Sequence, residues 1–185
     1  LPDNVAGKLV DAYIDRLLDK PYLHDKVEFE IVYSCYTLDL HERLQSLKSE
    51  GFSDREIATI TEHLKELTNK IIDPELGLWK EDAGKLDILK ERKEKLLQSS
   101  IGTLDTIYWL IEDTKRYGTL PFAGLARAGF IAVQFLKSLV SVGVFTQHDY
   151  DSFMNSLTTV SGQLAHDRSI LSKEMFLNKY GHLRP

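Results

Sequence analysis

One short stretch, "KVEFEIVYS" at residues 26–34, is the only part of the sequence in which apolar and charged side chains clearly alternate with the period of a β-strand. Val27, Phe29 and Ile31 would share one face of such a strand. A lone strand cannot pair its own backbone groups, so we expect it to lie against something outside the chain or at the edge of a neighbouring domain. The rest carries helical periodicity. The sequence therefore predicts an all-α multi-helix bundle with one short strand near residues 26–34.

Capping signals predict where several helices begin. Asp3 or Asn4 can cap a first helix that "DKP" ends at Pro21. Ser53 and Glu56 have the spacing of a capping box, and a helix to about residue 72 should follow. Thr146 can cap a helix near the end of the chain.

A central helix stands out by its small residues. Helical periodicity stops at Gly118, and a new helix is predicted from Leu120 to Gly143 with Pro121 in its first turn. Its first half is rich in side chains that let another element approach closely: Ala123, Gly124, Ala126, Ala128, Gly129 and Ala132. Helix packing explains these glycines better than a phosphate-binding loop, because a P-loop needs Gly-Lys-Ser/Thr at its end.

Bulk composition limits the class of protein. A chain of 185 residues with 43% hydrophobic and 28% charged residues suits one helical domain over residues 1–185. The net charge of -5 and the lack of a basic stripe argue against a nucleic-acid partner. A single cysteine, Cys35, is interpreted as a buried, inert thiol in a reducing compartment. The reducing compartment is taken to be the cytoplasm. Because Arg127, Gln134 and Lys137 interrupt the most apolar stretch, we expect no transmembrane segment and no membrane partner.

Motifs for metal or hydrolytic chemistry are missing from the sequence. It has no Glu-x-x-His or His-Glu-x-x-His, no cysteine pair, and no Gly-x-Ser-x-Gly. Three His-Asp neighbours occur, one of them His166 and Asp167, but adjacent residues on a helix point in different directions. These pairs are interpreted as polar side chains at the surface. We expect no catalytic and no metal-binding residue in the chain.

Arg127 is the exception on the central helix. It is the only charged residue between Thr119 and Gln134, so we expect its guanidinium to be partly buried and to need an anion or carbonyl groups. Two readings remain open. Arg127 either pairs with a carboxylate of another helix, or it binds an anionic or phosphorylated ligand.

The ending "FLNKYGHLRP", with "LPFAGLARAGFIA" and "SLTTVSGQLAHDRSIL" before it, resembles the segment that precedes the phosphohistidine domain in phosphoenolpyruvate synthase-like proteins. Within this family of phosphoenolpyruvate-utilising phosphotransferases, it is most similar to the barrel-less kinases, such as glutamine kinase and rifampicin phosphotransferase. "HDKVEFEIVYSCYTLD" also resembles the start of their middle helical region. With no initiator Met at Leu1, the chain is expected to be a piece of a larger multidomain enzyme.

The resemblance implies an ATP-dependent enzyme in which a histidine carries phosphate between two sites. This chain would be its helical linker or acceptor-binding domain, inactive alone. Its partners would be the ATP-grasp and phosphohistidine domains of the same parent chain and a small-molecule phosphate acceptor. ATP and Mg²⁺ are cofactors expected for the parent enzyme and not for this part of it. The residues expected to bind substrate are Arg127, Tyr180, His182 and Arg184.

Two alternatives to this interpretation stay open. The ending can also be a helix C-terminus at which Gly181 forms a cap and neighbouring cations suit the helix dipole. The whole chain can also be a helical protein-interaction module with no small-molecule site. Only the ending and Arg127 favour the phosphotransferase over this module.

Overall fold

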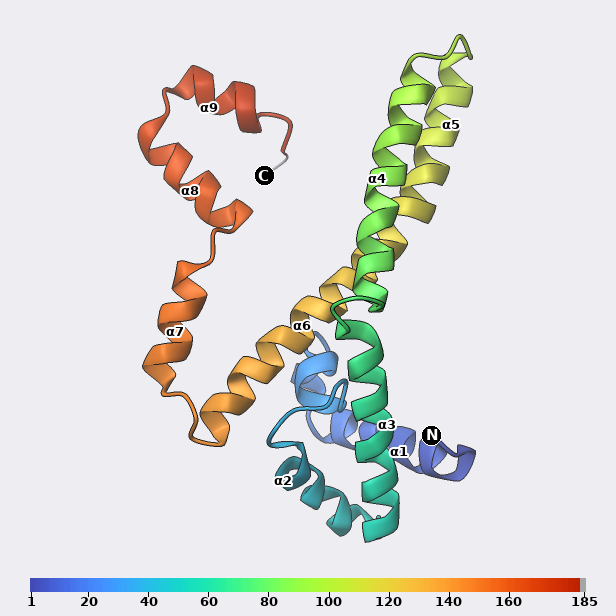
Figure 1. The fold of residues 1–185 in the computed structure, drawn as a ribbon, viewed down its shortest axis with the longest axis vertical. Coiled ribbons are helices and arrows are strands. Elements are labelled where there is room, and N and C mark those ends of the chain that lie inside the picture. The colour runs from blue at the N-terminus through green and yellow to red at the C-terminus, as the bar shows by residue number, and fades with distance from the viewer. Residues whose placement is uncertain (184–185) are drawn as a thin grey trace. The chain divides into compact units, whose positions relative to one another are not determined.

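The computed structural model describes residues 1–183 and is all-α, which confirms the predicted fold class (Figure 1). Its internal contacts divide the chain into two compact units. The first unit is Leu1–Val142, and the second comprises the described residues from Gly143 onward. Each unit is described by itself.

The first unit is built from helices of very different lengths. In chain order they are α1 (Asp3–Asp19), the 3₁₀ turn η1 (Pro21–Leu23), the π-helical turn η2 (Val27–Ile31), α2 (Leu40–Leu44), the 3₁₀ helix η3 (Gln45–Glu50), α3 (Asp54–Ile72), α4 (Leu78–Leu97), α5 (Thr103–Asp113), the π-helical segment η4 (Thr114–Thr119) and α6 (Leu120–Ser141). The first helix ends at Asp19, inside "DKP" and before Pro21 as predicted, but Pro2 stands at its N-cap and Asp3 lies in its first turn. The predicted capping box of α3 is confirmed, with the Ser53 and Glu56 side chains each accepting the other's backbone N–H.

The prediction of a strand near residues 26–34 is wrong. Residues 27–31 form the π-helical turn η2, closed by the Val32 N–H donating to the Val27 carbonyl, and residues 32–38 follow as irregular chain without a partner strand. A helical turn satisfies its own backbone groups, which a lone strand cannot do. Three amides of the irregular segment donate to hydroxyl groups of surrounding helices. These bonds are Tyr33 N–H to Tyr13 Oη (3.1 Å), Tyr36 N–H to Thr68 Oγ1 (2.8 Å) and Leu38 N–H to Ser138 Oγ (3.3 Å).

The main apolar core of the first unit lies where α1, α2, η3 and α3 meet. The buried side chains of this core are Val5, Leu9, Ala12, Leu40, Leu44, Leu47, Phe52, Ile57 and Ile60. A smaller cluster joins the irregular segment to α3 and α6 through Cys35, Ile71 and Ile131. The buried position predicted for Cys35 is confirmed, and burial raises the pKa of its thiol. These two clusters fix residues 32–38 between helices that are far apart in the sequence.

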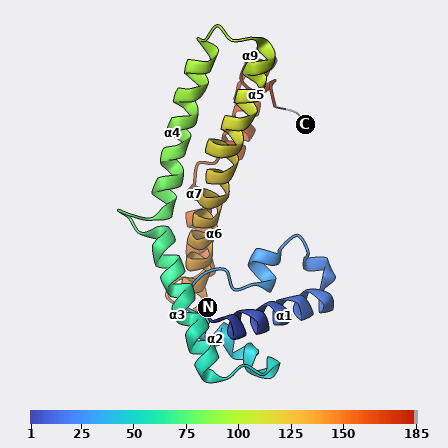
Figure 2. The ribbon, with the colours of Figure 1, turned by 90° about the vertical axis from the view of Figure 1, so that its right-hand side faces the viewer.

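Helices α4 and α5 run antiparallel side by side, and α4 also packs on η4 and α6 (Figures 1 and 2). The helix predicted to stop at Gly118 does not stop there, because η4 carries it on into α6. The predicted close approach is confirmed at Gly124, where a Cβ atom would overlap the carboxylate of Asp82 on α4. Arg92 and the buried Asp113 form an ion pair of 2.8 Å that ties α4 to α5.

Residues Thr103–Ser141 form one continuous helix, whereas the sequence predicted two helices with a stop at Gly118. The continuous helix has 39 residues and is, by length and composition only, long and apolar enough to cross a membrane. Core helices of soluble proteins meet the same test, but little of this helix is buried.

The second unit contains α7 (Gln147–Ser156), α8 (Val160–Ile170) and α9 (Lys173–Tyr180). Each begins at a hydroxyl N-cap, namely Thr146, Thr159 and Ser172, and the prediction for Thr146 is confirmed. Among the described residues of this unit, Asp167 is the one with a buried side chain. Polar contacts at Asp167, more than apolar burial, therefore connect α8 to α9.

Candidate anion-binding site

Arg127 lies in the first half of α6 and is exposed, not partly buried as the sequence predicted. Within residues 1–183 its guanidinium makes no ion pair and no hydrogen bond. The first interpretation of Arg127, a pair with a carboxylate of another helix, is therefore wrong for these residues. Arg127 instead lines two neighbouring hollows of the first unit. An exposed cation beside a hollow can bind an anionic ligand without first breaking an internal pair.

The smaller hollow lies between α4 and α6 and has a volume of about 360 Å³. Its charged lining includes Glu81, Asp82 and Lys85 of α4. Lys85 Nζ lies 3.1 Å from the Glu81 carboxylate and 3.0 Å from that of Asp82. Hydrogen bonds to Asp82 and then Glu81 raise the pKa of Lys85. This hollow therefore contains two carboxylates that already share one cation.

The larger hollow lies between residues 28–34, α3 and α6 and has a volume of about 460 Å³. Most of its lining is apolar, and Arg127 is its one cation. The lining residues are Glu28, Val32, Tyr33, Ser34, Leu64, Leu67, Ala123, Arg127, Phe130 and Ile131. Phe130 also packs edge-on against Phe29, with 4.8 Å between ring centroids, which joins η2 to α6.

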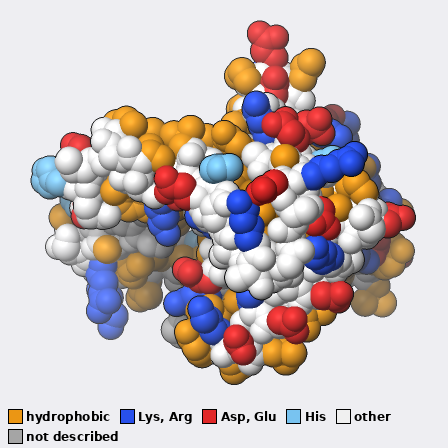
Figure 3. All heavy atoms as spheres, turned by 90° about the horizontal axis from the view of Figure 1, so that it is seen from below, with side chains coloured by type: hydrophobic (Ala, Val, Ile, Leu, Met, Phe, Trp, Pro, Cys, Tyr) orange, Lys and Arg blue, Asp and Glu red, His pale blue; other side chains and the backbone are white. Residues whose placement is uncertain are grey.

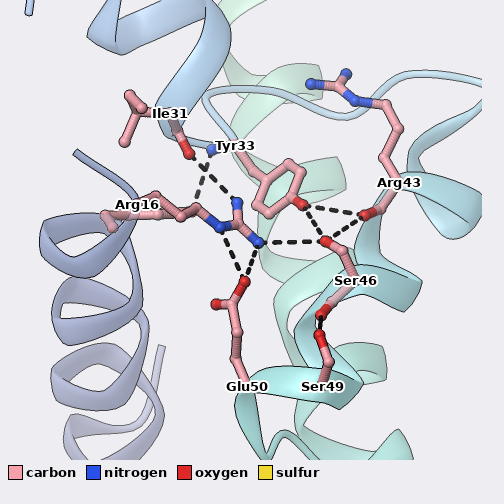
Figure 4. Close-up of polar contacts among 8 residues, drawn as sticks. Arg16, Ile31, Tyr33, Arg43, Ser46, Ser49 and Glu50 are labelled. Atoms are coloured by element: carbon pink, nitrogen blue, oxygen red, sulfur yellow. Dashed lines mark hydrogen bonds and ion pairs between the residues drawn. The ribbon is translucent and has the colours of Figure 1, made fainter. Parts of the chain in front are cut away.

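Tyr33, at the edge of the larger hollow, is held by a polar cluster on its other side (Figure 4). Its hydroxyl donates to the Arg43 carbonyl at 3.0 Å. The Arg16 guanidinium lies 5.1 Å from the centre of its ring and donates to the Glu50 carboxylate at 2.9 and 3.0 Å. Arg16 also donates to the Ile31 carbonyl at 3.4 Å. This cluster connects Tyr33 and the end of η2, which form one wall of the hollow, to α1 and η3.

A partly buried phenol, that of Tyr13, also holds Tyr33 in place. Tyr13 of α1 accepts the Tyr33 N–H, and burial is the largest cause that raises the pKa of Tyr13 to about 12. The Tyr13 hydroxyl therefore stays protonated at neutral pH. It serves as a neutral hydrogen-bond partner for the chain and not as a proton acceptor.

The predicted tail residues lie in the second unit, where Tyr180 ends α9. The Tyr180 hydroxyl and the Lys179 ammonium both donate to Asp167 Oδ2 at 2.6 Å, and the Gln163 amide donates to Oδ1 at 2.7 Å. These hydrogen bonds, that from Lys179 first, lower the pKa of Asp167 to about 2. The hydrogen bond to Asp167 in turn raises the pKa of Tyr180. The surface role assigned to Asp167 from sequence is wrong, since its side chain is 6% exposed.

Two further residues of the tail, His182 and Arg184, were also predicted to bind substrate. His182 is exposed, two residues after Tyr180, and Arg184 lies outside the described residues. Tyr180 and His182 therefore share the end of α9, whereas Arg127 belongs to the first unit. Among residues 1–183, no group of three or more His, Cys, Asp or Glu side chains could hold a metal ion.

Sequence reasoning missed Asp167 and the apolar lining of the larger hollow. Gln163 and Asp167 have the i, i+4 spacing of a helical pair, which was a usable signal. No sequence pattern indicated the larger hollow, because its walls come from three separate segments. No family model matches the chain, and no curated protein and no solved structure is significantly similar to it.

Proposed function

We propose that this chain is the helical linker or acceptor-binding domain of a phosphoenolpyruvate synthase-like, ATP-dependent phosphotransferase that works through a phosphohistidine carrier. The proposal takes its reaction class from the resemblance of "LPFAGLARAGFIA" and "FLNKYGHLRP" to that family. ATP and Mg²⁺ would bind to an ATP-grasp domain of the same cytoplasmic parent protein. The chain alone would bind the acceptor and catalyse nothing.

The observation that carries the proposal is the guanidinium of Arg127, which has no partner among residues 1–183 and lies beside two hollows. Phosphoryl transfer depends mainly on positioning and on neutralising charge at the transferred group. Arginine suits this role because its planar donors can bind two phosphate oxygens at once. An arginine without an internal partner keeps all of these donors available for a ligand.

The tail adds a second group of donors in its own unit. Asp167 holds the hydroxyl of Tyr180 and the ammonium of Lys179 at the end of α9, close in sequence to His182 and Arg184. From the resemblance we propose that Tyr180, His182 and Arg184 form a second group of substrate-binding residues, within the second unit and separate from the hollows beside Arg127. In this arrangement Asp167 would orient the tail without touching the acceptor.

Labelled phosphate, followed in the full-length enzyme that the resemblance implies, separates the two half-reactions. Arg127→Ala should slow transfer from phosphohistidine to the acceptor on the order of 10² to 10³, as the loss of one transition-state donor does. Formation of phosphohistidine from ATP should be unchanged. Lys137→Ala, on the same helix but away from both hollows, is the matched control. Equal loss of both half-reactions, or loss of neither, would contradict a role in acceptor binding.

The alternative, a protein-interaction module, is favoured by the number of large apolar side chains at the surface (Figure 3). On α5 they include Leu104, which is 82% exposed, as well as Ile107, Tyr108, Trp109 and Ile111. Hydrogen exchange of α5 in the full-length protein and in the chain alone tests this role. Strong additional protection of α5 in the full-length protein would identify it as an interface with another domain.

A further inference from the structure

We infer that the larger hollow binds an organic anion whose apolar body lies against Leu64, Leu67 and Phe130 and whose anionic group binds Arg127. To call this ligand the phosphate acceptor, or its phosphorylated product, rests on the proposed function. The binding itself does not, because it depends only on the lining of the hollow.

The size and lining of the hollow determine the apolar part of the ligand. A cavity of about 150 Å³ lined by apolar side chains is known to bind benzene. The hollow here has about 460 Å³, which is enough for a body of two fused rings. Small-molecule sites of this volume are typically lined by apolar and aromatic side chains with few polar groups. Leu64, Leu67 and Phe130 provide such a lining from α3 and α6.

The charges around the hollow determine where the anionic group lies. Arg127 is its cation, whereas Glu28, on η2, is its one carboxylate. An anion is repelled by Glu28 and attracted to Arg127, so the anionic group belongs at the α6 side of the hollow. An apolar body beside the guanidinium excludes water and strengthens that attraction.

The neighbouring hollow between α4 and α6 is the poorer site for the same ligand. Its lining contains Glu81 and Asp82, and Lys85 is already paired with both of them. An incoming anion would have to compete with these carboxylates for the available cations. Arg127, which has no ion pair or hydrogen bond within residues 1–183, is therefore better placed to bind an anion from the side of α3.

The walls of the larger hollow are formed before a ligand arrives. The Ser34 hydroxyl donates to the Glu28 carbonyl at 3.2 Å, and Tyr33 is fixed by the cluster around Arg16. Ile131 is buried in the small core cluster beneath the hollow. Preformed walls reduce the entropy that is lost on binding.

Isothermal titration calorimetry with 1-naphthyl phosphate, inorganic phosphate and 1-naphthol tests the inference on the chain as it exists. We expect 1-naphthyl phosphate to bind about tenfold or more tightly than either of the other two, because only it uses both the apolar wall and Arg127. Arg127→Gln should reduce its affinity to that of 1-naphthol. Inorganic phosphate that bound as tightly as 1-naphthyl phosphate would overturn the role of the apolar wall.

A matched pair of leucines distinguishes the two hollows. Leu67 lines only the larger hollow and Leu120 only the smaller one, and both are exposed enough, at 41% and 66%, to be replaced without loss of the core. Leu67→Gln should weaken binding of 1-naphthyl phosphate, whereas Leu120→Gln should not. Methyl chemical-shift changes of Leu67 and Leu120 in the unaltered chain give the same assignment without a substitution. An effect at Leu120 alone would overturn the inference.

These experiments distinguish a failure of this inference from a failure of the proposed function. If 1-naphthyl phosphate does not bind but Arg127→Ala still slows acceptor phosphorylation, the phosphotransferase role stands and the ligand class is wrong. If 1-naphthyl phosphate binds as expected but both half-reactions are unaffected by Arg127→Ala, the anion site stands without a role in phosphate transfer.

Discussion

Each of the two units is stabilised internally by a different kind of interaction. In the first unit, α1, α2, η3 and α3 enclose a continuous apolar core in which Leu40, Leu44 and Leu47 have no exposed surface. In the described part of the second unit, the buried side chain is a carboxylate, Asp167, with donors from α8 and α9 around it. Apolar burial does not depend on pH, whereas a salt bridge does. The comparison predicts that the two units respond differently to the same perturbation.

The largest effect should come from a cavity in the apolar core. Leu44→Ala removes a side chain that is 0% exposed and should lower the free energy of unfolding of the first unit by about 2–5 kcal/mol. Urea unfolding followed by circular dichroism measures this change. Leu104→Ala, at a position that is 82% exposed in the same unit, should change stability by less than about 0.5 kcal/mol. Similar losses for both variants would show that the first unit does not depend on this core.

A smaller and more local effect is expected from Asp167→Asn. The substitution removes the charge that holds Lys179 and weakens the bond from Tyr180. Hydrogen exchange should become faster in α8 and α9 and stay unchanged in α1 and α3. Glu174→Gln, an exposed position in the first turn of α9, is the control and should leave both regions unchanged. Faster exchange in α1 or α3 would mean that the units are not independent in stability.

Acid should reproduce the loss at Asp167 without a substitution. The folded pKa of Asp167, about 2, lies below the ordinary value of 3.8, so the folded unit favours the ionised carboxylate. Its contribution to stability is fully present above about pH 4 and is lost as the pH falls through 3.8 to about 2. Hydrogen exchange of α8 and α9 between pH 5 and pH 2 should show this loss. The Asp167→Asn variant should show no such dependence, and an equal dependence in both proteins would contradict the assignment.

Features decided by neighbouring residues could be predicted from the sequence. The capping box of Ser53 and Glu56, the cap at Thr146 and the all-α class all depend on local spacing, and all are confirmed. The small residue Gly124 also predicted a close helix contact correctly. The capping signals act within about one helical turn, where sequence and geometry are directly linked, whereas Gly124 indicates close packing without identifying its partner.

Features decided by distant residues could not be predicted. The alternation in "KVEFEIVYS" suggested a strand, but the hydroxyls of Tyr13, Thr68 and Ser138, which satisfy the chain after η2, come from three helices. Asp167 meets Tyr180 thirteen residues later, across a turn between helices. The exposure of Arg127 depends on how α3, α4 and α6 pack around it. In each case the decisive partner lies outside the window in which a sequence pattern can be recognised.

Under the proposed function, this chain binds the acceptor and other domains of a larger enzyme carry out the phosphate chemistry. Calorimetry of the chain with ATP and Mg²⁺ tests this division most directly, because the sequence has no Gly-Lys-Ser/Thr loop to hold the phosphates. We predict no detectable heat of binding at micromolar ATP and no release of inorganic phosphate. A micromolar dissociation constant for ATP would contradict the account, since the chain would then contain a nucleotide site of its own.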